Sequence, residues 1–105
     1  MRSVRKPIKE LKRRLTELYG PKLKEILLFG SWARNEGTTE SDIDLLIILE
    51  DDIIPGQEID RMIDIITDIN LAYNTLISVI PVSKKSYNEV NSPLFLNVRK
   101  EGIPL

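Results

Sequence analysis

The chain has 105 residues, enough for one hydrophobic core and too few for two, so we expect residues 1–105 to form a single domain. It contains no cysteine and no histidine, which excludes disulfides, thiolate zinc sites, cysteine nucleophiles and a histidine general base. Any catalysis must therefore use carboxylates, hydroxyls, lysine, arginine or a metal ion held by oxygen. The apolar runs are too short to span a bilayer and no signal-like segment opens the chain, so we expect a cytoplasmic protein without a membrane partner.

The net charge of −1 hides a strong asymmetry along the chain. Residues 1–24 carry nine Lys and Arg against two acidic residues, whereas residues 36–68 carry eleven Asp and Glu against one Arg. Two solvated helix faces of opposite sign are the simplest interpretation. The alternative is a basic N-terminal helix that binds nucleic acid, nucleotide phosphate or an acidic partner. Nucleic acid is the weaker alternative, because this helix lacks the interleaved aromatic residues that base stacking uses.

The hydrophobic pattern predicts helices and strands that alternate along the chain. In order, the expected elements are a helix over 7–19, a buried strand over 25–29, a loop over 35–40, a strand over 42–49, a helix over 57–73, a strand over 75–82, a short helix over 84–90 and a last helix from 93 to about 102. The buried stripe is expected at Ile8, Leu11, Leu15 and Leu18 in the first helix, and at Ile59, Met62, Ile63, Ile66 and Ile69 in the second. This alternation indicates an α/β (α+β) fold with helices packed on a small sheet. The first two strands are linked by only about twelve residues, which is short for a parallel crossover, so that pair can run in either direction.

Gly30 and Ser31 directly follow the first predicted strand. A glycine at the end of a buried strand lets the backbone turn sharply or approach a ligand closely. Ser31 is placed to cap a short helix over 32–34, whose free N–H groups would form an anion site. Arg34 in that helix is either an additional phosphate contact or an ordinary surface arginine. Alone, a Gly-Ser pair is more often a simple turn and cap.

Asp42 and Asp44 carry the most specific signal in the chain. Aspartates two apart on a strand point to the same face, and at about 6 Å with an effective dielectric of about 20 they repel by roughly 3 kcal/mol. Asp44 also lies inside an apolar run, where a partly buried carboxylate needs a compensating charge or ligand. A Mg²⁺ ion between the two would turn this repulsion into ligation, because Mg²⁺ binds carboxylate oxygens together with substrate phosphates.

The pattern Gly30-Ser31, ten residues, then Asp42-Ile43-Asp44 between apolar strands resembles the polymerase-beta nucleotidyltransferase superfamily. The likeness is greatest to the minimal, single-domain prokaryotic members, the MNT proteins, and extends to the closing segment 92–102. The resemblance implies a mixed, partly antiparallel sheet. It also implies that Gly30 and Ser31 hold the triphosphate of ATP or another nucleoside triphosphate. Asp42 and Asp44 would bind two Mg²⁺ ions for transfer of a nucleotidyl group to a hydroxyl.

Minimal members are often paired with a small helical HEPN protein as a toxin–antitoxin couple, so the resemblance implies such a partner with this chain as the antitoxin. A chain of this size has little room for its own acceptor pocket, which favours a partner or a homodimer that supplies the other wall. One departure from the family matters. Active members usually carry a third acidic residue on a later strand, facing the aspartate pair, and the position that aligns with it here is Ser78.

Two hypotheses follow from that departure. The first is an active nucleotidyltransferase, in which water or an acid recruited from Glu36, Glu40 or Glu50 replaces the third carboxylate. The second is a catalytically weakened nucleotide-binding module that neutralises a partner protein by binding it.

Overall fold

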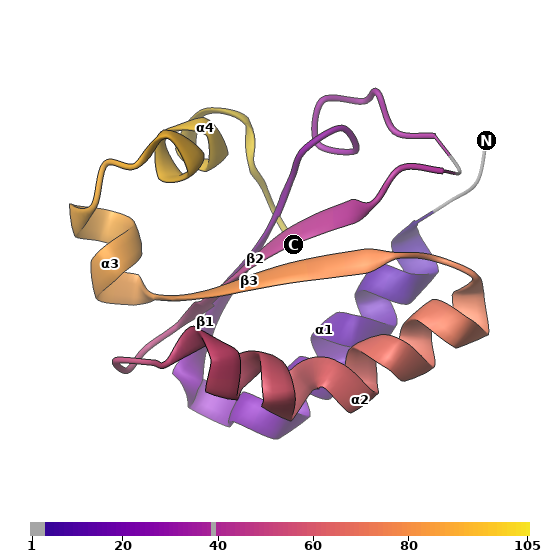
Figure 1. Cartoon of the computed structure of the whole chain (residues 1–105), viewed down its shortest axis with the longest axis horizontal. Coiled ribbons are helices and arrows are strands. Elements are labelled where there is room, and N and C mark those ends of the chain that lie inside the picture. Colours follow the sequence, from indigo (N-terminus) through magenta and orange to yellow (C-terminus); the bar gives the residue numbers. More distant parts are fainter. Residues whose placement is uncertain (1–3, 39) are drawn as a thin grey trace.

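The computed structural model describes residues 4–38 and 40–105, which form a mixed sheet with helices on both faces (Figure 1). The elements in chain order are α1 (Arg5–Tyr19), a 3-10 turn (Gly20–Lys22), β1 (Leu23–Phe29), β2 (Ile43–Leu49), α2 (Pro55–Tyr73), β3 (Ile77–Ser83), α3 (Lys84–Glu89), α4 (Pro93–Glu101) and β4 (Ile103–Pro104). The α/β class and the longer predicted elements are confirmed, with bounds shifted by at most two residues. In the part of the chain that the structure describes, no helix is both long and apolar enough to cross a membrane.

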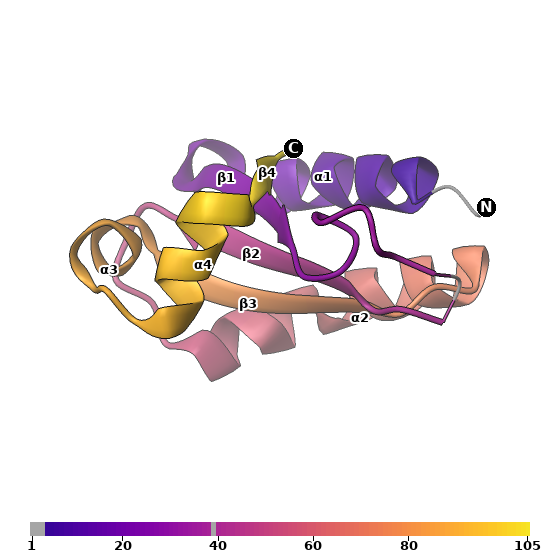
Figure 2. The same ribbon diagram turned by 90° about the horizontal axis from the view of Figure 1, so that it is seen from above.

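The strands are arranged in the order β3-β2-β1-β4, and β2 is central (Figure 2). β1 pairs with β2 in the antiparallel sense. The residue pattern alone leaves this direction open, and the antiparallel pairing is the one that the family resemblance implies. β2 and β3 are parallel, and α2 makes the crossover between them. The two-residue strand β4, which the sequence pattern does not predict, pairs antiparallel with β1.

Both faces of β2 are covered, which explains its unbroken apolar sequence. Its odd-numbered residues, from Ile43 to Leu49, pack in one cluster with Leu11, Leu15, Met62 and Ile66 of α1 and α2. Its even-numbered residues Leu46 and Ile48 pack in a second cluster with Val98 of α4 and the partly buried Tyr87 and Phe95. Alternation along the strand therefore places Asp42 and Asp44 on the α3–α4 side of the sheet.

The rows of residues predicted to be buried in α1 and α2 are partly wrong. Leu18 of α1 and Ile63 of α2 are 43% and 46% exposed, and Ile59 is also exposed. Tyr19 and Glu58 are buried instead. The inward face of α2 is the row of Glu58, Met62, Ile66 and Ile69, so the helix is rotated by about one residue from the orientation that its isoleucines predict.

The start of β3 is fixed by a side chain from the last turns of α2. Asn70 Oδ1 accepts hydrogen bonds from the Ile77 N–H at 2.8 Å and from the Thr75 hydroxyl at 3.2 Å. Asn74 ends the helix in the left-handed conformation, with φ of 52°. These contacts set where β3 begins and hence the position of Ser78.

The outer strand β3 contains a proline. Pro81 is the register partner of Ile47 on β2, and β3 forms one edge of the sheet. Proline cannot donate a ladder hydrogen bond, which confines it to edge strands and bulges.

Candidate active site

The antiparallel pairing of β1 with β2 brings Gly30 next to Asp44. Phe29 is the register partner of Asp44, and Gly30 follows it in a left-handed conformation with φ of 76°. A Cβ atom at Gly30 would overlap the Asp44 carboxylate. Glycine is therefore required here for two reasons, backbone conformation and the space that the carboxylate occupies.

The segment after Gly30 forms a turn, so the predicted short helix over 32–34 is wrong. The N–H of Arg34 donates to Gly30 O, that of Asn35 to Trp32 O and that of Glu36 to Ser31 O, at 2.8 to 3.3 Å. Asn35, in the left-handed conformation with φ of 59°, ends the turn after about one helical repeat. The amides of residues 31–33 take no part in these three bonds.

Trp32 connects this turn to the segment just before β2 through a hydrogen bond. Its indole N–H donates to Ser41 O at 3.4 Å, and the ring packs against the core that α1 and α2 share. Gly37 lies so close to the ring that an added Cβ would overlap it. The indole thus holds together the two segments that carry Ser31 and Asp42.

Asp44 is half-buried and Asp42 is exposed, one residue before β2 begins. Burial, and then the negative charge of Asp42, raise the pKa of Asp44, while the positive charge of Arg34 lowers it. Among the described residues, no hydrogen bond or ion pair reaches either carboxylate. The two acids therefore repel each other, as the sequence predicts, and in the described part of the chain neither has a hydrogen-bond or ion-pair partner.

Arg34 is exposed and lies close enough to influence Asp44. Its Nε is 3.3 Å from Glu36 Oε2, and its Nη1 is 3.6 Å from Glu101 Oε2 at the end of α4. The sequence analysis missed Glu101, because only the packing of α4 on the sheet brings it to the turn. Arg34 is thus the only predicted site residue that is already ion-paired in the described part of the chain.

Ser78 lies beside Asp44, because the two are register partners on parallel neighbouring strands. Ile80, two residues on, packs in the same cluster as Leu46, so Ser78 and Asp44 share a face of the sheet. A carboxylate at position 78 would therefore face the same space as the Asp42–Asp44 pair.

The acids proposed as replacements for the third carboxylate do not assemble at the site. Glu50 lies past the far end of β2, paired with Lys24 at 3.3 Å, and Glu40 lines a separate pocket with Trp32 and Leu76. Glu36 is paired with Arg34. Residues 4–38 and 40–105 contain no group of three or more acidic residues placed to hold a metal ion. The expectation that one of these acids completes a three-carboxylate site is therefore wrong for this conformation.

The donor set nevertheless suits a magnesium ion that is shared with a substrate. Mg²⁺ is commonly held by one or two carboxylates together with phosphate oxygens and water, rather than by an all-protein cage. Asp42 and Asp44 supply two carboxylates that no described residue pairs with, and their mutual repulsion favours a cation between them. Asp42 and Asp44 therefore fit a Mg²⁺ ion whose remaining ligands are phosphate oxygens and water.

The comparisons with known proteins agree with this fold. The model of the nucleotidyltransferase domain family matches residues 8–92. A relative named "Putative protein adenylyltransferase MJ0604" from Methanocaldococcus jannaschii is 39% identical over 98 residues, which cover 92% of this chain and 92% of the relative. A second, "Putative protein adenylyltransferase MJ0141" from the same organism, is 37% identical over 78 residues, 73% of this chain and 77% of the relative. The chain belongs to the nucleotidyltransferase domain family.

Solved structures show the same fold at lower sequence identity. A toxin–antitoxin structure with AMP-PNP superposes with a TM-score of 0.62 at 19% identity, covering 90% of this chain and 68% of that one. A mutant of the MntA-HpeT toxin–antitoxin gives a TM-score of 0.61 at 23% identity, covering 100% of this chain and 72% of that one. The chain thus shares its fold with chains of these two toxin–antitoxin structures.

Gly30→Ala tests the close approach of the turn to Asp44. We expect the variant to lose about 1–3 kcal/mol of stability, because alanine is strained at positive φ and its methyl group displaces the carboxylate. Urea unfolding measures this loss. Gly56→Ala is the matched control, since an added Cβ there meets open space. Equal stability of the two variants would contradict the described contact.

Asp44→Asn tests the electrostatic cost of the aspartate pair. Folding raises the pKa of Asp44, so the folded state binds its proton more tightly and stability falls as pH rises from the ordinary value of 3.8 through the raised pKa. Without metal, Asp44→Asn should therefore melt a few degrees higher than the wild type at neutral pH. The gain should disappear below the ordinary carboxyl pKa.

Thermal unfolding in the presence of a chelator, from about pH 3 to pH 8, measures this difference. Asp60→Asn, which removes an exposed carboxylate of α2, is the control and should change the melting temperature little at any pH. A variant of Asp44 that is less stable than the wild type at neutral pH would show that the carboxylate is not electrostatically strained.

Proposed function

We propose that residues 1–105 act as one nucleotidyltransferase domain that transfers a nucleoside monophosphate from ATP, or another nucleoside triphosphate, to a hydroxyl group. The observation that carries this proposal is the pair of carboxylates, Asp42 and Asp44, which lie beside the Gly30–Ser31 turn without a hydrogen-bond or ion-pair partner among the described residues. The two relatives are each named "Putative protein adenylyltransferase", and these names support ATP as the donor and a protein side chain as the acceptor. A cytoplasmic site of action, where nucleoside triphosphates and Mg²⁺ are available, is part of the proposal.

In this proposal the turn positions the triphosphate. The amides of residues 31–33 and the Ser31 hydroxyl bind the β- and γ-phosphates and so align the α-phosphorus with the incoming hydroxyl. Arg34 exchanges its contacts with Glu36 and Glu101 for a phosphate oxygen, a charge-assisted contact that guanidinium groups favour. Gly30 allows this approach because it has no side chain.

Asp42 and Asp44 are the residues that would hold Mg²⁺, with two ions as the proposed number. When bound, the metal neutralises charge on the attacking and leaving oxygens of the in-line displacement. The hydroxyl oxygen forms a new bond to the α-phosphorus, the bond from that phosphorus to the bridging oxygen breaks, and pyrophosphate leaves. With Ser78 in place of a carboxylate, the hydroxyl proton passes to water.

The acceptor is proposed to belong to a partner protein. Two fold neighbours come from toxin–antitoxin structures, which supports a toxin as the partner. An antitoxin role toward a small helical toxin of the HEPN type is part of the proposal. The partner, or a second copy of this chain, would supply the other wall of the acceptor site.

A second function is favoured by one observation, the serine that lies beside Asp44 where a third carboxylate would stand. In this alternative the chain binds a nucleotide without appreciable turnover and neutralises its partner by forming a complex. The two functions make different predictions for the same assay.

The assay is label transfer from ATP labelled at the α-phosphate, with Mg²⁺ and a candidate partner protein. We expect the wild type to label the partner, and Asp42→Asn/Asp44→Asn to lose on the order of a hundredfold or more of the rate, because the metal ligands are removed. ATP labelled at the γ-phosphate should transfer no label, and Asp60→Asn should behave as the wild type. Intact ATP together with a stable protein complex would contradict the enzyme and favour the binding function.

Ser78→Asp tests what the missing carboxylate does. The added charge faces the Asp42–Asp44 pair, so we expect Mg²⁺ affinity to rise on the order of tenfold and metal-free stability to fall through like-charge repulsion. Isothermal titration with Mg²⁺, with and without a non-hydrolysable nucleotide, measures the affinity. Ser78→Asn is the uncharged control of equal size. Equal affinities of these two variants would show that position 78 does not face the metal site.

A further inference from the structure

Arg34 is held by two carboxylates that come from different parts of the chain. Its Nε lies 3.3 Å from Glu36 Oε2, and its Nη1 lies 3.6 Å from Glu101 Oε2. Glu36 belongs to the same turn, so the first contact stays within the turn. Glu101 is the last residue of α4, so the second contact connects the turn to the C-terminal part of the fold. The charge of Arg34 also acts on Asp44, which places the guanidinium near the aspartate pair.

The last turn of α4, which carries Glu101, is held in place by the two residues at its start. Val98 is buried in the cluster that α4 forms with the sheet. Arg99 donates hydrogen bonds to the carbonyl oxygens of Tyr87 and Val90, in and just after α3. The backbone that leads into Glu101 is therefore fixed against both the sheet and α3.

The residues that follow Glu101 are fixed as well. Gly102 donates its N–H to Val98 O at 2.7 Å, and an added Cβ on this glycine would overlap that oxygen. β4 comes next and pairs with Leu27 and Leu28, near the end of β1 (Figure 2). Glu101 thus lies between two anchored segments, and the packing of the fold sets the position from which its carboxylate meets the turn.

The two carboxylates occupy both binding edges of the Arg34 guanidinium. Such a group has two edges on which a pair of parallel N–H groups can bind one phosphate, the first formed by Nε and Nη2 and the second by Nη1 and Nη2. Glu36 takes the Nε position of the first edge, and Glu101 takes the Nη1 position of the second. A phosphate can therefore use both N–H groups of either edge only after a carboxylate has left it.

The contact between Arg34 and Glu101 is accessible to a ligand. The two side chains are 43% and 41% exposed. Water and salt screen such an exposed pair, so it shifts an equilibrium by at most about fivefold. Glu101 therefore restrains Arg34 weakly enough for a triphosphate, which carries several negative charges, to displace it.

We propose that Glu101 is an autoinhibitory residue of the candidate active site, whose carboxylate holds Arg34 in the free protein and competes with the triphosphate for it. This inference rests on the proposed function, because it takes the turn after Gly30 as the triphosphate site. The coupling is reciprocal: a bound triphosphate releases Glu101, and withdrawal of Glu101 strengthens triphosphate binding.

The test is calorimetric titration of the full chain with inorganic tripolyphosphate and with a non-hydrolysable ATP analogue, each in the presence of Mg²⁺. We expect Glu101→Gln to bind both ligands about two- to fivefold more tightly than the wild type, because a neutral amide competes poorly for a guanidinium. A merely structural role of Glu101 predicts equal or weaker binding. Arg34→Gln should weaken binding several-fold, and in that background Glu101→Gln should have no further effect.

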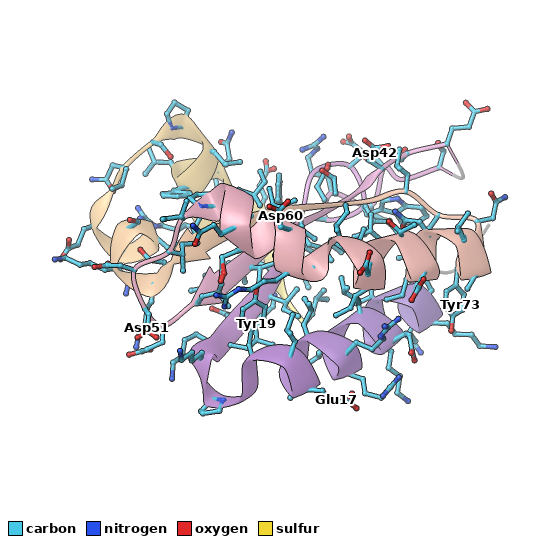
Figure 3. The ribbon with its side chains drawn as sticks, turned by 60° about the horizontal axis from the view of Figure 1, so that its bottom comes forward. Glu17, Tyr19, Asp42, Asp51, Asp60 and Tyr73 are labelled. Atoms are coloured by element: carbon cyan, nitrogen blue, oxygen red, sulfur yellow. The ribbon has the colours of Figure 1, made fainter. Side chains whose placement is uncertain are left out.

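Loss of any carboxylate makes the net charge less negative, which by itself favours an anionic ligand. Asp60→Asn is the matched control, because Asp60 lies on α2, apart from the loop that carries Asp42 (Figure 3). At an ionic strength of about 0.15 M, where the screening length is about 8 Å, this variant should bind both ligands as the wild type does. Should Glu101→Gln fail to fold, Glu101→Asp, whose shorter side chain moves the carboxylate away from Arg34, is titrated instead with the same expected direction.

Four results would overturn the autoinhibitory role. They are unchanged or weaker binding by Glu101→Gln, an equal gain in Asp60→Asn, a gain that persists without Arg34, and the absence of tripolyphosphate binding in every variant. Label transfer by the wild type without the gain in affinity sinks this inference alone. The gain in affinity without label transfer supports it and contradicts the enzyme, so the two failures are distinguishable.

Discussion

The register of the central strand β2 is the constraint on which the candidate active site depends. β2 pairs with β1 on one side and β3 on the other, and this double pairing places Asp44 between Gly30 and Ser78. A shift of one residue would turn Asp44 into the core under α1 and α2 and bring Leu45, which is fully buried, to the opposite face. Apolar packing on both faces therefore holds the carboxylate in its place.

Much of the fold could be predicted from the sequence because the strong signals are local. The apolar runs that become β1 and β2 are continuous, and proline or serine residues mark the starts of α3 and α4, where the Ser83 and Ser92 hydroxyls accept hydrogen bonds from backbone amides. The rotation of α2 could not be predicted, because Ile59 and Ile63 make as good a stripe as the row that contains Glu58. Packing against α1 decides between the two rows, and this information is not local.

In the candidate site, too, the features with a local sequence signal could be predicted and those set by tertiary packing could not. The spacing of the two aspartates indicates that they share a face of the sheet. In agreement with that geometry, the negative charge of Asp42 adds to burial in raising the pKa of Asp44. The turn after Gly30 could not be predicted, since it depends on the left-handed Asn35 and on the fit of Gly37 against an indole ring. Glu101 is separated from Arg34 by most of the chain, so no local pattern connects them. The two ends of β2 share one property: each has a carboxylate oxygen that lacks a hydrogen-bond partner among residues 4–38 and 40–105.

Pro81 limits how this molecule can assemble with others. Exposed sheet edges invite neighbouring chains to continue the hydrogen-bond ladder, which is a common route to domain swapping and fibre growth. An incoming strand laid along β3 would meet a ring without an amide proton part-way along the edge, so a long uninterrupted ladder could not form there. A second protomer or another protein is thus not expected to extend the sheet along β3, and this edge is protected from open-ended polymerisation.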